Sequence, residues 1–122
     1  PQARVTAVDE SHMAIASASL NLATHGIEPT RTHCLVNNCL DDFAPESADV
    51  VMCNPPFHQL QAVTDHIAWQ MFCDAQRVLE PKGRIVVIGN RHLGYHTKLK
   101  RLFGNAQVIA SNRKFVIVEA YK

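Results

Sequence analysis

The sequence lacks the features of a disulfide-bonded or metal-binding protein. It has only four cysteines, and no two of them form a CxxC pair or match a common zinc-ligand spacing. The seven histidines are scattered, and none forms a Cys/His pair at ligand spacing. We therefore expect no metal and no disulfide. The thiols expected in a reducing cytosol are Cys34, Cys39, Cys53 and Cys73.

Long apolar runs and a strong net charge are also missing. No segment approaches the roughly 20 apolar residues of a membrane span, and no basic segment followed by an apolar one opens the chain. We therefore expect a cytoplasmic protein with no membrane partner. The formal charge of +1 neither supports nor excludes a nucleic-acid partner. With 122 residues and 47% apolar content, the chain suits one compact globular domain.

Apolar segments with strand and helix periodicity alternate along the chain. Gly26 and Gly104 each follow a helical pattern, and 80–83 (Glu-Pro-Lys-Gly) is a stop and turn signal. The order predicts an α/β fold with a mostly parallel sheet and a terminal antiparallel hairpin. The expected strands are 4–8, 32–36, 48–53, 84–89, 107–110 and 114–120, and the expected helices are 11–26, 62–79 and 97–103.

The most informative feature is the segment Asn54-Pro55-Pro56-Phe57, which directly follows a strand. Two consecutive prolines lack the N–H groups that a sheet ladder needs, so the strand ends at Asn54 in a stiff corner. An asparagine side-chain carbonyl and a neighbouring proline carbonyl can accept two hydrogen bonds from one planar amino group. An aromatic ring beside them can stack on the attached base or amide. The corner therefore predicts a site that holds an NH2 group, although a mere strand-ending turn is the alternative.

Three polar residues follow strands that are expected to be parallel. Asp9, Asn38 and Asn54 lie at or just past strand ends, and ligands of such sheets bind at the carboxyl ends of strands. Other interpretations remain open, because Asp9 can serve the dipole of the next helix and Asn38 is a common turn residue. Further candidates also have ordinary interpretations. His58, Asp65 and His66 are candidates for an acid/base pair, but solvated helix-start positions explain them equally well. Trp69 and Phe72 are expected in the core rather than in a substrate platform. A solvated helix face, rather than phosphate contacts, is the expected place of Arg91, Lys98, Lys100 and Arg101.

Several segments carry a resemblance to one family. They are Val-Asp-Glu-Ser at 8–11, Asn-Asn at 37–38, Asn-Pro-Pro-Phe-His-Gln at 54–59, Thr-Asp-His-Ile-Ala-Trp at 64–69, Ile-Gly-Asn-Arg-His-Leu at 88–93 and Phe-Gly-Asn at 103–105. With them the chain resembles class I S-adenosylmethionine-dependent methyltransferases with a Rossmann-like sheet. Within that class it is most similar to the ribosomal RNA guanine-N2 methyltransferases, and nearest to those that modify the large subunit.

The resemblance implies a role for each matching residue. Asp9 would accept hydrogen bonds from the ribose hydroxyls of S-adenosylmethionine, and Asn38 would meet its adenine amino group. Asn54 would lie against the cofactor and, with the Pro55 carbonyl, hold the exocyclic N2 of a guanine in ribosomal RNA. Phe57 would stack on that base. The implied reaction is direct methyl transfer, with no metal and no covalent intermediate.

The resemblance also implies parts that precede residue 1. The family has a first strand and a Gly-rich turn upstream of Asp9, as well as an additional N-terminal domain. The chain begins Pro1-Gln2 without methionine. We therefore interpret residues 1–122 as an incomplete C-terminal methyltransferase catalytic domain that has lost the N-terminal part of its own chain. The missing strand would pair with the strands ending at Asp9 and Asn54, so we expect the isolated chain to bind cofactor weakly or not at all.

Other functions remain open at this point. The proline corner also suits amino methyltransferases that act on small-subunit ribosomal RNA guanine, on adenine N6 or on protein glutamine, because all these acceptors are planar amino groups. A non-catalytic RNA-binding module is a further alternative. A strand followed by a glycine-rich turn, encoded just upstream of Pro1, would favour an enzyme over the binding module.

Overall fold

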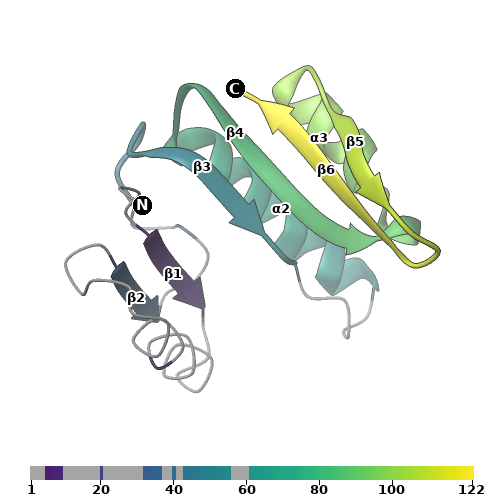
Figure 1. Ribbon diagram of the computed structural model, residues 1–122, viewed down its shortest axis with the longest axis horizontal. Helices are drawn as coiled ribbons and strands as arrows, with labels where there is room; N and C mark the ends of the chain where they lie inside the picture. Colours follow the sequence, from purple (N-terminus) through teal and green to yellow (C-terminus); the bar gives the residue numbers. More distant parts are fainter. Residues whose placement is uncertain (1–4, 10–19, 21–31, 37–39, 41–42, 56–60) are drawn as a thin grey trace. The chain divides into compact units, whose positions relative to one another are not determined.

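The computed structural model describes the chain except residues 1–4, 10–19, 21–31, 37–39, 41–42 and 56–60 (Figure 1). The chain forms two compact units, Pro1–Asp41 and Asp42–Lys122. Of the helix predicted over 11–26, only Leu20 is described, and it is helical. Within the described segments, no helix combines the length and the apolar content that a membrane span requires.

The first unit contains one parallel strand pair. Strand β1 (Val5–Asp9) pairs with β2 (Thr32–Val36), and Asp9 lies opposite Val36 at the carboxyl ends of both strands. The prediction of two successive parallel strands is confirmed. Asp9 ends its strand one residue later than expected, which keeps it at the edge where such sheets bind ligands.

The second unit is a four-stranded sheet with the order β3-β4-β6-β5. Strands β3 and β4 are parallel, while β6 is antiparallel to both of its neighbours. The prediction of a mostly parallel α/β sheet with a terminal antiparallel hairpin is therefore confirmed. The elements are β3 (Ala48–Cys53), α2 (Gln61–Val78), β4 (Leu79–Asn90), the 3-10 turn η2 (Arg91–Leu93), α3 (Tyr95–Phe103), β5 (Gln107–Ser111) and β6 (Phe115–Tyr121).

Helices α2 and α3 cover one face of this sheet (Figure 1). The rings of Phe72 on α2 and Tyr95 on α3 meet edge to face, with centroids 5.4 Å apart, and both side chains are buried. The core placement predicted for Phe72 is confirmed, while Trp69 is half-buried. The buried apolar side chains of α2 and of the sheet include Val51, Cys53, Ala68, Ala75, Val78, Ile85, Val87, Val118 and Ala120.

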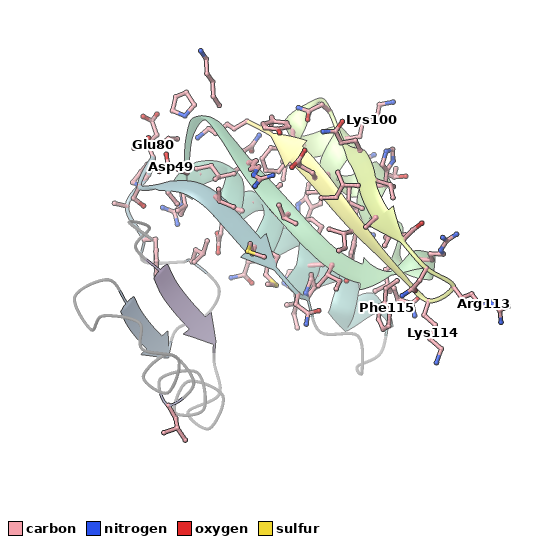
Figure 2. The ribbon with its side chains drawn as sticks, viewed as in Figure 1. Asp49, Glu80, Lys100, Arg113, Lys114 and Phe115 are labelled. Atoms are coloured by element: carbon pink, nitrogen blue, oxygen red, sulfur yellow. The ribbon has the colours of Figure 1, made fainter. Side chains whose placement is uncertain are left out.

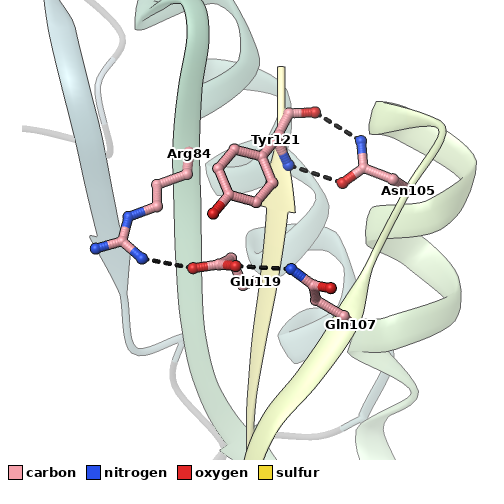
Figure 3. Close-up of polar contacts among 5 residues, drawn as sticks. All are labelled: Arg84, Asn105, Gln107, Glu119 and Tyr121. Atoms are coloured by element: carbon pink, nitrogen blue, oxygen red, sulfur yellow. Dashed lines mark hydrogen bonds and ion pairs between the residues drawn. The ribbon is translucent and has the colours of Figure 1, made fainter.

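Polar cross-links join the strands on the other face of the sheet (Figure 3). Arg84 on β4 donates to Oε2 of Glu119 on β6 at 2.5 Å, and Gln107 on β5 donates to Oε1 of Glu119 at 2.8 Å. Asn105 exchanges two hydrogen bonds with the backbone of Tyr121, at 2.7 and 2.8 Å. Three strands are thereby fixed laterally by side chains as well as by the backbone ladder.

The turn predicted at 80–83 differs in detail from the structure. Strand β4 begins at Leu79, which pairs with Ala48, and the next paired residue, Arg84, lies opposite Val50. Residues 80–83 therefore bulge out opposite Asp49 alone, with Lys82 in the left-handed region (φ 70°). The proline at 81 lies inside this bulge, where no ladder hydrogen bond is required of it.

Candidate functional site

The site is built on the carboxyl end of β3. Cys53, the last residue of β3, is buried, Asn54 is exposed, and the Pro55 side chain is fully buried. The exposed amide is thus held between two anchored neighbours, one in the strand and one with a fixed φ angle. This is the arrangement that the proline corner predicts. Pro56 and Phe57 lie outside the described residues.

The neighbouring strand extends the same edge. Cys53 pairs with Val87, and β4 continues three residues past that pair, through Ile88 and Gly89 to Asn90. Gly89 leaves room for a ring behind the edge. A Cβ atom on Gly89 would lie 2.6 Å from Cδ2 of the buried Tyr95 and also too close to Cε2 of that ring. The absence of a side chain at residue 89 therefore lets α3 start directly behind the edge that carries Asn54.

A hairpin tip forms the next part of the edge. Phe115, the first residue of β6, pairs with Asn90, the last residue of β4. The Arg91 N–H donates to the Lys114 carbonyl at 3.0 Å, and Arg91 Nε donates to the Asn112 carbonyl at 2.7 Å. Oδ1 of Asn112 accepts from the N–H groups of Lys114 and Phe115 at 2.9 and 2.8 Å. A basic turn is therefore fixed at the same edge as Asn54.

The predicted cofactor residues belong to the first unit or lie outside the described part. Asp9 is described as the last residue of β1, at a carboxyl end. Asn38, two residues beyond β2, is outside the described residues, as is His58. His66 is exposed on α2. The roles assigned to Asp9, Asn38, Asn54, Pro55 and Phe57 stay predictions.

The basic candidates divide between two ends of the second unit. Arg91 is at the carboxyl end of β4, whereas Lys100 and Arg101 are in the last turn of α3. That turn leads to Asn105, which bonds Tyr121, and Tyr121 pairs with Arg84 near the opposite end of β4. Figure 2 shows Lys100 at that opposite end, away from Arg113 and Lys114.

Sequence reasoning missed the hairpin tip, because 111–113 reads only as a turn. A signal was nevertheless present. Residues 81–118 contain eight of the chain's 12 Lys and Arg residues and none of its 11 Asp and Glu residues. The net charge of +1 hides this asymmetry, because the acidic residues gather in the rest of the chain.

The described groups with a shifted pKa owe the shift to burial and to neighbouring side chains. Burial, and then the charge of Asp74, raise the pKa of the Cys73 thiol. Hydrogen bonds from Arg84 and then Gln107 lower the pKa of Glu119. Among the described residues, no group of three or more His, Cys, Asp or Glu side chains could hold a metal ion. The chemistry that the described edge can perform is hydrogen bonding through the exposed Asn54 amide and, further along the same edge, attraction of anions by cationic side chains, of which Arg91 is held by a hydrogen bond.

Comparisons with known proteins agree with this architecture. The family model described as "Methyltransferase small domain" matches residues 1–119. A ribosomal RNA large subunit methyltransferase G from Vibrio campbellii is 61% identical over 124 aligned positions, which cover 100% of this chain and 32% of that protein. The protein of the same name from Aeromonas hydrophila is 63% identical, over 99% of this chain and 32% of that protein. The chain spans about a third of the length of these curated relatives.

Solved structures share the fold at lower identity. The 16S rRNA N2 guanine methyltransferase RsmC from T. thermophilus, in complex with AdoMet and guanosine, superposes with a TM-score of 0.80 at 22% identity. The match covers 98% of this chain and 31% of that one. TrmN from Thermus thermophilus gives a TM-score of 0.72 at 24% identity, over 100% of this chain and 37% of that one.

Proposed function

The chain belongs to the methyltransferase small domain family, and from this premise we propose that it is the acceptor-binding part of an enzyme that methylates the exocyclic N2 of a guanine in large-subunit ribosomal RNA. The observation that carries the proposal is the exposed Asn54 between the buried Cys53 and the buried Pro55. Its place at the carboxyl end of β3 is where ligands of such sheets bind.

The proposed chemistry is orientation of a weak nucleophile. The lone pair of a guanine amino group is delocalised into the ring, so the nitrogen attacks poorly. Oδ1 of Asn54 and the Pro55 carbonyl would accept one hydrogen bond each from N2, so that the lone pair faces the methyl carbon. The proton leaves after transfer, and no strong general base is assigned. Phe57 would stack on the flat face of the base, as aromatic side chains do with unpaired RNA bases.

The cofactor in this proposal is S-adenosylmethionine, which supplies the methyl group when bound. A carboxylate that ends a parallel strand is an acceptor-only group suited to two ribose hydroxyls, and Asp9 holds such a position in β1. The position of Asp9 fits the ribose part of the cofactor. Asn38 would bind the adenine amino group, and Asn54 would contact both cofactor and acceptor.

The substrate is proposed from the relatives. Two proteins named as ribosomal RNA large subunit methyltransferases are 61% and 63% identical to the chain. The RsmC structure contains AdoMet and guanosine, which supports guanine as the acceptor. Because the chain spans about a third of those relatives, the proposed activity belongs to a protein of their full length.

Replacing Asn54 with Ala in the full-length protein tests this assignment. Transfer of labelled methyl groups from the cofactor to undermethylated ribosomal RNA should fall by about 100-fold or more, since one of two acceptors at the reacting nitrogen is lost. Cofactor affinity, measured by calorimetry on the same preparation, should fall far less than transfer, by about tenfold at most, because the Asn54 contact to the cofactor is lost but the Asp9 and Asn38 contacts remain. Unchanged transfer by the variant would refute the role of Asn54.

A further inference from the structure

We infer that the tip of the β5–β6 hairpin, together with Arg91, binds phosphate groups of the substrate RNA beside the nucleotide presented to Asn54. The residues of this hairpin-tip cluster are Arg91, Asn112, Arg113, Lys114 and Phe115. The inference rests on the proposed function, and it names the surface that receives the RNA backbone.

Charge is the first observation. The hairpin tip and Arg91 fall within residues 81–118, which carry eight Lys or Arg residues and no Asp or Glu. Among the residues that the structure describes, the cluster's three cations, Arg91, Arg113 and Lys114, have no carboxylate partner. Arg84 differs from these three residues, because its charge is neutralised by the neighbouring Glu119 carboxylate. Unneutralised Lys and Arg gathered at one edge are the electrostatic pattern of a phosphate-binding surface.

Rigidity is the second observation. Arg91 uses its backbone N–H and its Nε to hold the turn, at 3.0 and 2.7 Å, so its guanidinium is fixed in place. The bonds described for this guanidinium use Nε alone, and the terminal nitrogens have the fork geometry that matches phosphate oxygens. The Asn112 side chain closes the turn through the N–H groups of Lys114 and Phe115. A cation that is already ordered loses less side-chain entropy on binding than a freely moving one.

Location is the third observation. Asn54 follows β3, and β6 starts two strands away, across β4, at the carboxyl edge of the parallel strands. Two strand spacings amount to about 10 Å. The cluster also lies further along the strands, because Cys53 is level with Val118 through Val87, and Phe115 is three residues beyond Val118, about another 10 Å. An RNA chain that places a guanine at Asn54 and continues along this edge therefore brings the phosphates of nucleotides a few positions away to the cluster. Figure 2 shows Arg113 and Lys114 pointing away from the sheet at the hairpin tip.

The shape of the cluster favours a nucleic-acid backbone over a small molecule. Residues 112–115 line a shallow, open depression with a volume of about 300 Å³ rather than an enclosed cavity, and its lining is mostly apolar, which suits stacking against a base or sugar beside the cationic groups. Phe115 is half-buried where β6 begins, directly after the turn, and adds an aromatic ring to the cationic side chains. Proteins that bind single-stranded nucleic acid combine these two kinds of group.

A charge-matched pair of variants tests the inference in the full-length protein. Arg113→Ala/Lys114→Ala removes two charges from the cluster, and Lys100→Ala/Arg101→Ala removes two exposed charges from the far end of α3. The probe is undermethylated large-subunit ribosomal RNA, titrated at several salt concentrations. Cofactor affinity, measured for each variant, reports whether the fold is retained.

We expect the hairpin variant to bind the RNA about tenfold more weakly at ~0.1 M salt, with cofactor affinity unchanged. The slope of log affinity against log salt should fall in magnitude by about 1.5, the value for two lost phosphate contacts. The α3 variant should keep the wild-type slope to within about 0.5. Equal effects of the two variants, or an unchanged slope in the hairpin variant, would overturn the inference.

The readouts separate this inference from the proposed function. A wild-type protein that binds the RNA with the expected hairpin dependence but transfers no methyl group would contradict the proposed function and support the inference. If the wild-type protein methylates the RNA and the hairpin variant binds the RNA as well as the wild type, the proposed function is supported and the inference is contradicted. Failure of the wild-type protein to bind the RNA would overturn both.

Discussion

Glu119 is a carboxylate in the middle of β6, only 5% exposed, and each of its oxygens accepts a hydrogen bond. Its partners Arg84 and Gln107 lie 35 and 12 residues away in the sequence. The apolar pattern of this strand predicted β6 correctly, but no local signal could identify the partners of a buried charge. Burial of the Glu119 carboxylate is tolerated because both of its oxygens accept hydrogen bonds and its partner Arg84 remains exposed.

Replacing Glu119 with Gln should weaken the pH dependence of stability in acid. The pKa of Glu119 is lowered by its hydrogen bonds from Arg84 and Gln107. A carboxylate with a lowered folded-state pKa stabilises the protein above its unfolded pKa, about 4.3, and this contribution is lost as pH falls through the folded value. The free energy of unfolding by urea, compared between pH ~5 and pH ~3, should fall less in Glu119→Gln than in the wild type. Parallel pH profiles would contradict this explanation.

Gly89 is the second residue whose identity is fixed by a contact from another element. We expect Gly89→Ala to destabilise the protein by about 1–3 kcal/mol, because the new methyl group overlaps the ring of the buried Tyr95. Urea unfolding measures the loss. In a double-mutant cycle with Tyr95→Leu, the cost of the alanine should decrease, because the smaller side chain removes the overlap. An undiminished cost in the cycle would argue for a different cause.

Sequence periodicity predicted the type of every described α-helix and strand of the second unit, although not the 3-10 turn η2, and most boundaries differ by one or two residues. Strands 32–36 and 48–53 match β2 and β3. The largest differences occur where tertiary contacts override local signals. Helix α3 starts at Tyr95 rather than 97, because Tyr95 packs against Gly89 and Phe72. Residues 80–83 are a bulge within β4 because β4 already pairs with β3 at Leu79.

The Asn105 side chain replaces a strand residue at the end of the β5–β6 ladder. Its amide donates to the Tyr121 carbonyl and accepts from the Tyr121 N–H, as a paired peptide group does (Figure 3). We expect Asn105→Ala to cost about 1 kcal/mol and to speed hydrogen exchange at the Tyr121 amide. Asn105→Asp is the matched control, since it retains the acceptor and should preserve more of the Tyr121 protection. Equal exchange rates in the wild type and the alanine variant would contradict the assigned role.

At the scale of the whole molecule, the candidate site could be predicted only in part. The sequence predicted the end of β3 before Asn54 and the exposure of Asn54 correctly, because a proline pair after a buried strand has few conformations, while the role of Asn54 stays a prediction. It did not predict that the β5–β6 turn reaches the same edge, since strand order is set by long-range pairing that local patterns do not encode. The hairpin-tip cluster is brought close to Asn54 by the placement of β6 next to β4.

The 122-residue chain by itself should bind S-adenosylmethionine weakly or not at all. Strands β1 and β3 each have a pairing partner on one side only among the described residues. The family resemblance implies a first strand and a glycine-rich loop, both upstream of Asp9, that would contribute to the cofactor site. Calorimetry measures the affinity of the 122-residue chain and of the full-length protein for S-adenosylmethionine. Micromolar affinity of the 122-residue chain would contradict the prediction.

The identity of the methylated nucleoside distinguishes methylation of guanine N2 from methylation of any other acceptor. The full-length protein is incubated with S-adenosylmethionine carrying a labelled methyl group and with undermethylated large-subunit ribosomal RNA. The RNA is then digested to nucleosides, which are separated by chromatography and identified by mass spectrometry. The proposed function predicts label in N2-methylguanosine and in no other nucleoside. Label in an adenine, or label recovered in protein glutamine and not in RNA, would contradict it.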